Sequence, residues 1–279
     1  MEPTHHDAML RGMKVHYAEA GDGPPLLLIH GFLVSHKEWL PILPSLAASH
    51  RCIAVDLPGF GASDKRPPGQ YPYTREAYAA TLAELLSSLG IDRAHVCGHS
   101  MGGGIAMTLA ADHPSLVERL VLIDPASHPF PMPFKGRLPM LPVFGPILFK
   151  RLYGRSLFRD YFRNDVFSGH PGLDLARVDE YFEDFRGKES REAAYECLQR
   201  AVAPLETLVE RIPRVTAPTL LLWGEEDRIF PVSLAHRLVR ELPSCQLVIL
   251  EGCGHAANEE QPERTAELIR GHLSKTGGP

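Results

Sequence analysis

A serine between two glycines predicts a sharp turn from a strand into a helix. The segment GHSMG at residues 98–102 has an apolar run before it and the helix-forming run 105–111 after it. In that setting, G-x-S-x-G holds the hydroxyl of Ser100 above the carboxyl end of a buried strand. Glycines suit the pattern because the turn is strained and its neighbours pack closely. The segment therefore favours an α/β sheet carrying a nucleophile, with a plain glycine-rich helix start as the alternative.

Short apolar runs recur along the chain and alternate with segments that carry helical signals. Runs typical of strands covered on both faces lie at 26–29, 51–55, 95–97, 120–123, 219–223 and 246–250. A helix is expected at 74–89, where Thr74 suits an N-cap and Gly90 a stop. The alternation predicts the α/β class, with a mostly parallel central sheet and helices on both faces.

The first fifty residues support three local expectations. Residues 1–12 are polar and are expected to form a loose lead-in before the first strand. His5 and His6 could be half of a metal site, but no further ligand lies nearby in the sequence, so we interpret them as solvated. The segment 35–38 has the capping-box pattern and predicts the start of a helix over 39–48.

A proline-rich stretch separates the two parts of the α/β pattern. Seven prolines lie within 125–146, a density that excludes a regular helix or a central strand. Residues 147–203 then have helical character, with a face of arginines at every fourth position: Arg151, Arg155, Arg159 and Arg163. We interpret this face as solvated, with weak attraction to an anionic membrane surface as the alternative. The predicted domains are a core in two parts, 1–125 and 208–279, and a helical cap at 126–207.

Composition excludes several classes of protein. Hydrophobic residues make up 44% of the 279 positions, enough for a large buried core. A net charge of −5 offers no basic field for nucleic acid. No apolar run reaches the roughly 18 residues that stable membrane insertion needs, and no signal peptide is visible. Five scattered cysteines fit neither a disulfide framework nor a metal site, so we expect a cytoplasmic protein; its oligomeric state cannot be inferred.

Residues capable of chemistry follow the ends of five predicted strands: Phe32, Ser100, Asp124, Asp227 and His255. Reactive groups of such sheets gather beyond the carboxyl ends of the strands, so we expect a single site. A serine needs a base to become a nucleophile, and a histidine oriented by a carboxylate is such a base. The order Ser, Asp, His together with the loop in which it lies favours Asp227 as the carboxylate, with Asp124, after the preceding strand, as its competitor. The amides of Phe32 and Met101 are candidate oxyanion-hole donors.

In these segments the chain resembles the α/β-hydrolase superfamily. The matching segments follow one another in the family's order: His30-Gly31-Phe32, 56–63, 98–103, 223–227 and Gly254-His255. The resemblance covers about residues 13–125 and 215–273. It implies the α/β-hydrolase fold with an inserted helical cap, and the roles of nucleophile, acid and base for Ser100, Asp227 and His255.

Serine at position 100 narrows the implied chemistry. Relatives that open epoxides or displace halide have aspartate there, whereas serine forms an acyl-enzyme with an activated carbonyl. The prediction is a serine hydrolase of carboxylic esters, carboxylesterase or lipase-like, without a metal or organic cofactor. Its partner would be a small-molecule ester with an apolar acyl group. On the substrate side we expect supporting roles for His30, Gly31 and His99, and an acyl pocket lined by Phe144 and Phe149.

Other functions stay open at this point. Carbon–carbon bond hydrolases of dienoic ring-cleavage products resemble this chain, as do cofactor-free perhydrolases and acyltransferases that use the same triad. The first group often has Asn before the nucleophile, where this chain has His99. A ligand-binding protein on a retired hydrolase fold is a further alternative.

Overall fold

An eight-stranded sheet forms the centre of the computed structural model, which describes residues 2–131, 138–141, 143–168 and 175–275. The strand order is β1-β2-β4-β3-β5-β6-β7-β8. The strands span Thr4–Leu10 (β1), Met13–Ala20 (β2), Pro25–Ile29 (β3), Arg51–Val55 (β4), Ala94–His99 (β5), Val117–Ile123 (β6), Thr219–Gly224 (β7) and Cys245–Leu250 (β8). Only the β1–β2 and β2–β4 pairs are antiparallel. The predicted mostly parallel sheet is confirmed.

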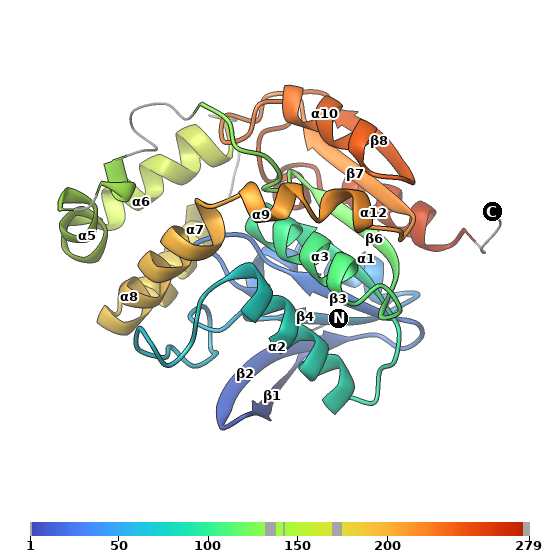
Figure 1. Ribbon diagram of the computed structural model, residues 1–279, viewed down its shortest axis with the longest axis horizontal. Helices are drawn as coiled ribbons and strands as arrows, with labels where there is room; N and C mark the ends of the chain where they lie inside the picture. Colours follow the sequence, from blue (N-terminus) through green and yellow to red (C-terminus); the bar gives the residue numbers. More distant parts are fainter. Residues whose placement is uncertain (1, 132–137, 142, 169–174, 276–279) are drawn as a thin grey trace.

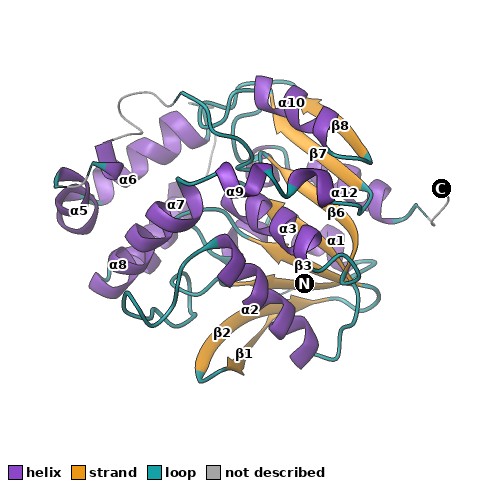
Figure 2. Cartoon of the chain, viewed as in Figure 1, coloured by secondary structure: helices purple, strands orange, loops and turns teal. Residues whose placement is uncertain are grey.

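The two faces of this sheet are covered by separate layers of helices (Figures 1 and 2). Leu27 and Ile29 of β3 belong to the apolar cluster that includes α2 and α3, whereas Leu26 and Leu28 belong to the cluster that includes α1 and α12. Successive side chains of a strand point to opposite faces, which explains why this run is continuously apolar. The helices of the core are α1 (Leu43–Ala47), α2 (Arg75–Ser88), α3 (Met101–Asp112), α10 (Ser233–Glu241), α11 (Ala257–Glu260), α12 (Pro262–Leu273) and the 3₁₀ turn η6 (Ile212–Arg214).

The amino-terminal segment forms an edge strand rather than the expected loose lead-in. β1 pairs with β2 along its whole length, from Thr4 opposite Glu19 to Leu10 opposite Met13. Residues 11 and 12 join the two strands with positive φ angles, as a tight hairpin turn requires. Most side chains of β1 are exposed. An edge strand with so little apolar burial carries no alternating apolar pattern, which is why the prediction was wrong here.

The helix predicted over 39–48 is also broken. A 3₁₀ turn, η1, covers His36–Trp39, and the short helix α1 follows only at Leu43. Pro41 between them has no backbone N–H and clashes with a preceding helical turn. The Ser35 side chain makes no capping hydrogen bond.

The segment between β6 and β7 contributes further helices; the first of them lie beyond one end of the sheet, whereas α9 lies beside α3 (Figure 1). They are η2 (Leu138–Met140), α5 (Phe144–Ile147), η3 (Leu148–Leu152), α6 (Arg155–Tyr161), η4 (Phe162–Val166), α7 (Leu175–Phe185), α8 (Lys188–Cys197), η5 (Leu198–Val202) and α9 (Glu206–Val209). The boundaries of the cap at 126 and 207 stay a prediction. Within the described ranges, no helix is both long enough and apolar enough to cross a bilayer.

The row of arginines in this segment is not one solvated face. The chain leaves the helix at Tyr153, so Arg151 and Arg155 lie on different helices. Arg155 and Arg159 form ion pairs with Asp179 of α7, and Arg155 also pairs with Glu183. Acidic partners on a neighbouring helix therefore balance this part of the predicted basic face.

Two glycines allow β5 to turn directly into α3 against the end of β3. A Cβ at Gly98 would collide with the carbonyl oxygen of Gly102, and a Cβ at Gly102 would collide with that of Ile29. The backbones therefore touch without intervening side chains. The residue between them, Ser100, is left at the apex of the turn.

We expect Gly102→Ala to destabilise the protein by about 1–3 kcal/mol, because the added methyl forces two backbone segments apart. Gly271→Ala is the matched control, since its Cβ would meet nothing within 4 Å and alanine favours the helix. The free energy of unfolding from urea denaturation measures both. Equal stability of Gly102→Ala and the unmodified chain would refute the backbone-contact argument.

Candidate active site

The strand order creates a crevice at β3, where successive connections turn toward opposite edges of the sheet. β3 pairs with β4 on one side and with β5 on the other, so the connections leaving β3 and β4 run toward opposite edges of the sheet. Ligands of open α/β sheets bind at such a point, outside the carboxyl ends of the strands. The loop after β3 and the turn after β5 meet there: a Cβ at Gly31 would lie 3.4 Å from the Cβ of Ser100.

Ser100 occupies a strained backbone conformation at this crevice. Its φ of 53° and ψ of −117° belong to a region that non-glycine residues rarely adopt. Hydrogen bonds to the loop after β6 hold it there: Ser100 N donates to Ile123 O at 2.9 Å, and Ala126 N donates to Ser100 O at 2.9 Å. The side chain stands at the amino terminus of α3, where the helix dipole favours negative charge.

The hydroxyl of Ser100 begins a chain of short hydrogen bonds. It donates to His255 Nε2 at 2.9 Å, and His255 Nδ1 donates to Asp227 Oδ2 at 2.8 Å. The other oxygen of Asp227 accepts from the amides of Ile229 and Phe230 at 2.7 and 2.9 Å. The structure thus brings together three predicted residues that lie 28 to 155 positions apart.

Asp124, the competing carboxylate, is also close but has another partner. It follows β6 with a φ of 42° and accepts a hydrogen bond from Gly224 N at 2.8 Å. Burial and the neighbouring Asp227 raise the pKa of Asp124 well above its usual value. Asp124 is therefore favoured in the protonated form. Asp227, in contrast, is the carboxyl that accepts from His255 and from two backbone amides.

Two backbone amides next to Ser100 are available as donors. Met101 is the first residue of α3, where amides have no partner within the helix. Phe32 follows Gly31 in the loop beside Ser100, and neither its amide nor that of Met101 donates to another residue in the described parts of the chain. Such a pair suits an oxyanion.

His30 and His99 bond only to protein groups, which corrects the expectation that they face substrate. His30 Nε2 accepts from Leu57 N at 3.0 Å, and its Nδ1 donates to Gly31 O at 2.7 Å. His99 donates from Nδ1 to Glu38 at 3.0 Å and from Nε2 to the carbonyl of His255 at 2.8 Å. No ring nitrogen is left for a substrate. Burial opposes the charge of His99, but Glu38 and the carbonyl outweigh it and raise the pKa of His99.

Glu38, at the position assigned to the capping box, is a buried link between the elements of the site. Its carboxylate binds His99 with Oε2 and accepts the amide of Gly31 with Oε1 at 3.1 Å. It therefore joins the loop after β3 to the turn after β5. The sequence pattern gave no sign of this role, since it depends on a histidine 61 positions away.

A second buried carboxylate, Glu259, links the site to the cap helix α7. Tyr181 donates its hydroxyl to Glu259 at 3.1 Å, and Arg177 lies 3.9 Å from the same carboxylate. Burial and the nearby Glu38 raise the pKa of Glu259 to about 8. The cap also contacts the site through Val166, whose carbonyl accepts the backbone N–H of His255 at 2.8 Å.

Aromatic rings cover the oxyanion-hole candidate Phe32. Its ring centre lies 6.2 Å from that of Phe149 and 6.1 Å from that of Phe60. Phe149 thus lies where an acyl pocket is expected. Phe144 does not: its side chain is 46% exposed on α5, because the chain turns it outward before η3 begins.

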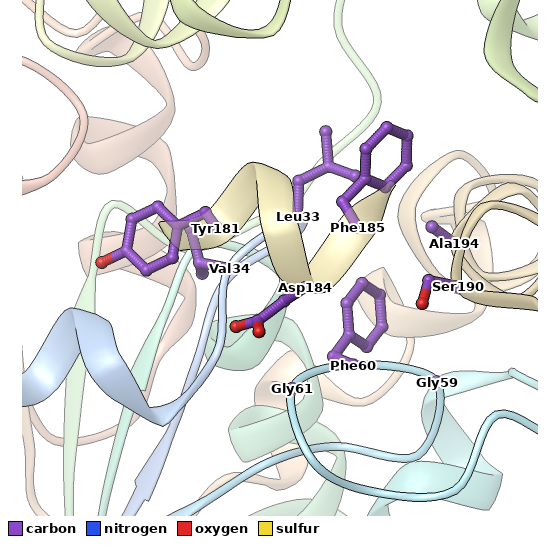
Figure 3. Close-up of a pocket in the computed structure, with 10 residues that line it drawn as sticks. All are labelled: Leu33, Val34, Gly59, Phe60, Gly61, Tyr181, Asp184, Phe185, Ser190 and Ala194. Carbon is purple, nitrogen blue, oxygen red and sulfur yellow. The ribbon is translucent and has the colours of Figure 1, made fainter. Parts of the chain in front are cut away.

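Beside these rings the cap is almost closed on the core. Figure 3 shows a cavity between two core loops and helices α7 and α8, with Leu33, Phe60 and Phe185 around it. Its volume of about 10 Å³ is close to the minimum for one water molecule.

This arrangement is that of hydrolases built on an open α/β sheet, with a serine at a strained turn between strand and helix. The family model for the alpha/beta hydrolase fold matches residues 24–262. The chain belongs to the alpha/beta hydrolase fold family.

Characterised relatives differ in the bond they cleave. The chain is 32% identical over 284 residues to a soluble epoxide hydrolase of Corynebacterium sp. strain C12, with 94% of each chain covered. It is 30% identical over 275 residues to 2-hydroxymuconate semialdehyde hydrolase of Pseudomonas sp. strain CF600, covering 95% of this chain and 92% of the relative. A crystal structure of a bacterial membrane phospholipase A superposes with a TM-score of 0.83 at 32% identity, covering 98% of this chain and 86% of that one.

Replacing the two aspartates separates their roles. Asp227→Asn removes the charge that orients the histidine, so we expect kcat to fall about 10⁴-fold. Asp124→Asn is the matched control, because the amide mimics a protonated carboxyl and keeps an acceptor for Gly224 N; its loss should be far smaller. Steady-state kinetics on an ester substrate tests this, and a larger loss in Asp124→Asn would reverse the assignment.

Glu259 makes stability depend on pH with a definite sign. The pKa of the Glu259 carboxyl is 4.5 in the unfolded chain and about 8 in the folded one. The folded state therefore binds more protons between these two pH values. Stability from this residue is complete below 4.5 and is lost as pH rises toward 8. Glu259→Gln cannot ionise, so its melting temperature relative to the unmodified chain should rise from about pH 5 to about pH 9. A difference independent of pH would contradict a raised pKa.

Proposed function

We propose that this chain is a serine hydrolase that cleaves carboxylic esters through an acyl-enzyme intermediate. The observation that carries the proposal is the continuous hydrogen-bonded chain from Ser100 through His255 to Asp227, beside two backbone amides that donate to no group among the described residues. We assign the catalytic roles of nucleophile, base and orienting carboxylate to these three residues, in that order.

In the first half of the reaction, His255 Nε2 removes the proton of Ser100 as Oγ attacks the ester carbonyl. The carbonyl oxygen becomes an oxyanion and accepts from the amides of Phe32 and Met101, each worth about 3 kcal/mol of barrier. Asp227 stabilises the imidazolium. The imidazolium then protonates the alkoxide that leaves, and an acyl-Ser100 remains. In the second half, water takes the place of the alcohol and the acid is released.

A cluster of aromatic rings supports an ester with an apolar acyl group. The rings of Phe32, Phe60 and Phe149 lie together at the loop whose Gly31 approaches Ser100, and they present an apolar surface. The cavity there is too small for an acyl chain, so we infer that the aromatic side chains of the cap move apart when substrate enters.

Five free cysteines, four of them buried, support a reducing compartment, and we further propose the cytoplasm.

Serine at position 100 weighs against epoxide opening, the reaction of one relative. In the resemblance described above, the members that open epoxides through an alkyl-enzyme have aspartate at this position. Cleavage of a carbon–carbon bond needs the same serine, histidine and aspartate. The similarity to 2-hydroxymuconate semialdehyde hydrolase favours it as the second candidate.

A series of p-nitrophenyl esters of increasing acyl length tests the proposal directly. We expect turnover that depends on acyl length, and a kcat about 10⁶-fold lower in Ser100→Ala. Labelling of Ser100, but not of Ser100→Ala, by a fluorophosphonate probe checks that the serine is activated.

The outcomes separate the candidates. Ester hydrolysis would be refuted if the unmodified chain turned over none of the esters faster than Ser100→Ala does. Cleavage of a coloured ring-fission dienoate in place of esters would establish the carbon–carbon hydrolase instead. Absence of both activities and of labelling would leave a binding protein.

A further inference from the structure

Three histidines from three elements converge at the edge of the sheet, far from Ser100 in the topology. His5 lies on β1, His16 on β2 and His36 on η1. In the β1–β2 hairpin, His16 pairs directly with Asp7, and side chains two residues apart on a strand share a face. His5 is therefore the diagonal neighbour of His16, on the face that meets η1. Strand pairing supplies the partner ligands that the local sequence does not.

The three imidazoles are close enough for one ion. His5 Nδ1 lies 3.1 Å from His16 Nε2, and their rings stack with centres 5.3 Å apart. Two nitrogens bound to one zinc ion at about 2.0–2.1 Å in tetrahedral geometry lie about 3.3 Å apart. One ligand nitrogen from each histidine, His36 included, lies within 4.8 Å of the other two.

Carboxylates orient two of these rings. His16 Nδ1 donates to Asp7 at 2.8 Å, and His36 Nδ1 donates to Asp56 at 2.9 Å. In both residues Nε2 is then the nitrogen with a free lone pair, which is the arrangement of carboxylate–histidine–metal sites.

Asp56 is itself firmly held and charged. It accepts from the amides of His36 and Ala62 at 2.7 and 2.8 Å. Burial alone would raise the pKa of Asp56, but the hydrogen bonds and charges of His36 and His30 lower it to about 2. The carboxylate therefore keeps His36 in one tautomer and one orientation.

We propose that His5, His16 and His36 bind one divalent transition-metal ion, zinc by preference, with water as the fourth ligand. Imidazole nitrogens suit zinc, and three protein ligands plus water complete its tetrahedron. The ion replaces the proton that His5 Nδ1 shares with His16, and His5 moves to the tautomer protonated at Nε2. Burial and the neighbouring His36 and His16 lower the pKa of His5, which favours the neutral ring that a metal needs.

The bound ion would tie the edge strand to the loop beside the active site. β1 contributes one ligand, and η1 contributes another four residues after Phe32. β1 otherwise packs mainly on β2. The proposal does not depend on the reaction proposed for Ser100.

Zinc titration of the chelator-treated chain, without a polyhistidine tag, tests the proposal by calorimetry. We expect one high-affinity ion per chain, lost in His5→Ala and in His16→Ala. Asp7→Asn should weaken binding about 10- to 100-fold, as loss of an orienting carboxylate does. His6→Ala is the matched control, because His6 lies on the other face of β1 and stacks on Tyr17 instead; it should bind zinc unchanged.

Further measurements exclude trivial explanations. Zinc should raise the melting temperature of the unmodified chain and of His6→Ala but not that of His5→Ala. Cobalt should give the absorption of a tetrahedral site only where all three ligands remain. Asp124, Asp227 and His255 also lie within 4.8 Å of one another and could bind zinc instead. His255→Ala tests this second group, and we expect it to keep the ion. No saturable zinc binding, equal loss in His6→Ala, or loss confined to His255→Ala would overturn the proposal.

Discussion

The contact between the start of α3 and the end of β3 is the constraint on which the rest of the structure depends. It is made of backbone on both sides, because Gly102 leaves no side chain between α3 and β3, and Gly98 likewise leaves none between β5 and α3. A backbone contact has no rotamers to adjust, so it fixes the strand, the turn and the helix as one unit. Ser100 is held at a positive φ by that unit and by hydrogen bonds from the loop after β6. The position of the candidate nucleophile is therefore a property of the sheet, not of its own side-chain packing.

Buried charge then connects the loops that the sheet only brings near one another. Burying a carboxylate is costly unless partners compensate. Glu38 has such partners in Gly31, on the loop of one candidate amide, and in His99, which precedes Ser100 and binds the carbonyl of His255. Without His99, the buried carboxyl of Glu38 would keep only the amide of Gly31 as a side-chain hydrogen-bond partner. The loops after β3, β5 and β8 consequently adopt one mutual arrangement, which is what a site with donors aimed at a developing charge requires.

The sequence predicted the parts of this architecture that follow from local pattern. Continuous apolar runs predicted the strands of the parallel sheet. The positions just after these strands predicted that Ser100, Asp227 and His255 would lie together, as they do. What it missed depends on contacts between distant segments. β1 is polar because it is an edge, Glu38 acquires its partners only through folding, and Arg155 is neutralised from another helix. Periodicity records which face of an element is buried but not what lies against it, so these roles leave no local trace.

The irregular cap helices indicate how one rigid apparatus can serve different reactions. In the described residues between α5 and α9, three π-helical segments interrupt the helices, whereas α2, α3 and α12 of the core are regular. Each π turn widens the helix and shifts the side chains after it to a different face. Phe149, whose ring stacks on that of Phe32, lies in one of these π turns. Meanwhile Val166 and Tyr181 anchor the same segment to His255 and Glu259. Substitutions in the cap can thus reshape the substrate pocket while leaving its anchors on the site in place. The sheet alone therefore does not determine which bond is cleaved.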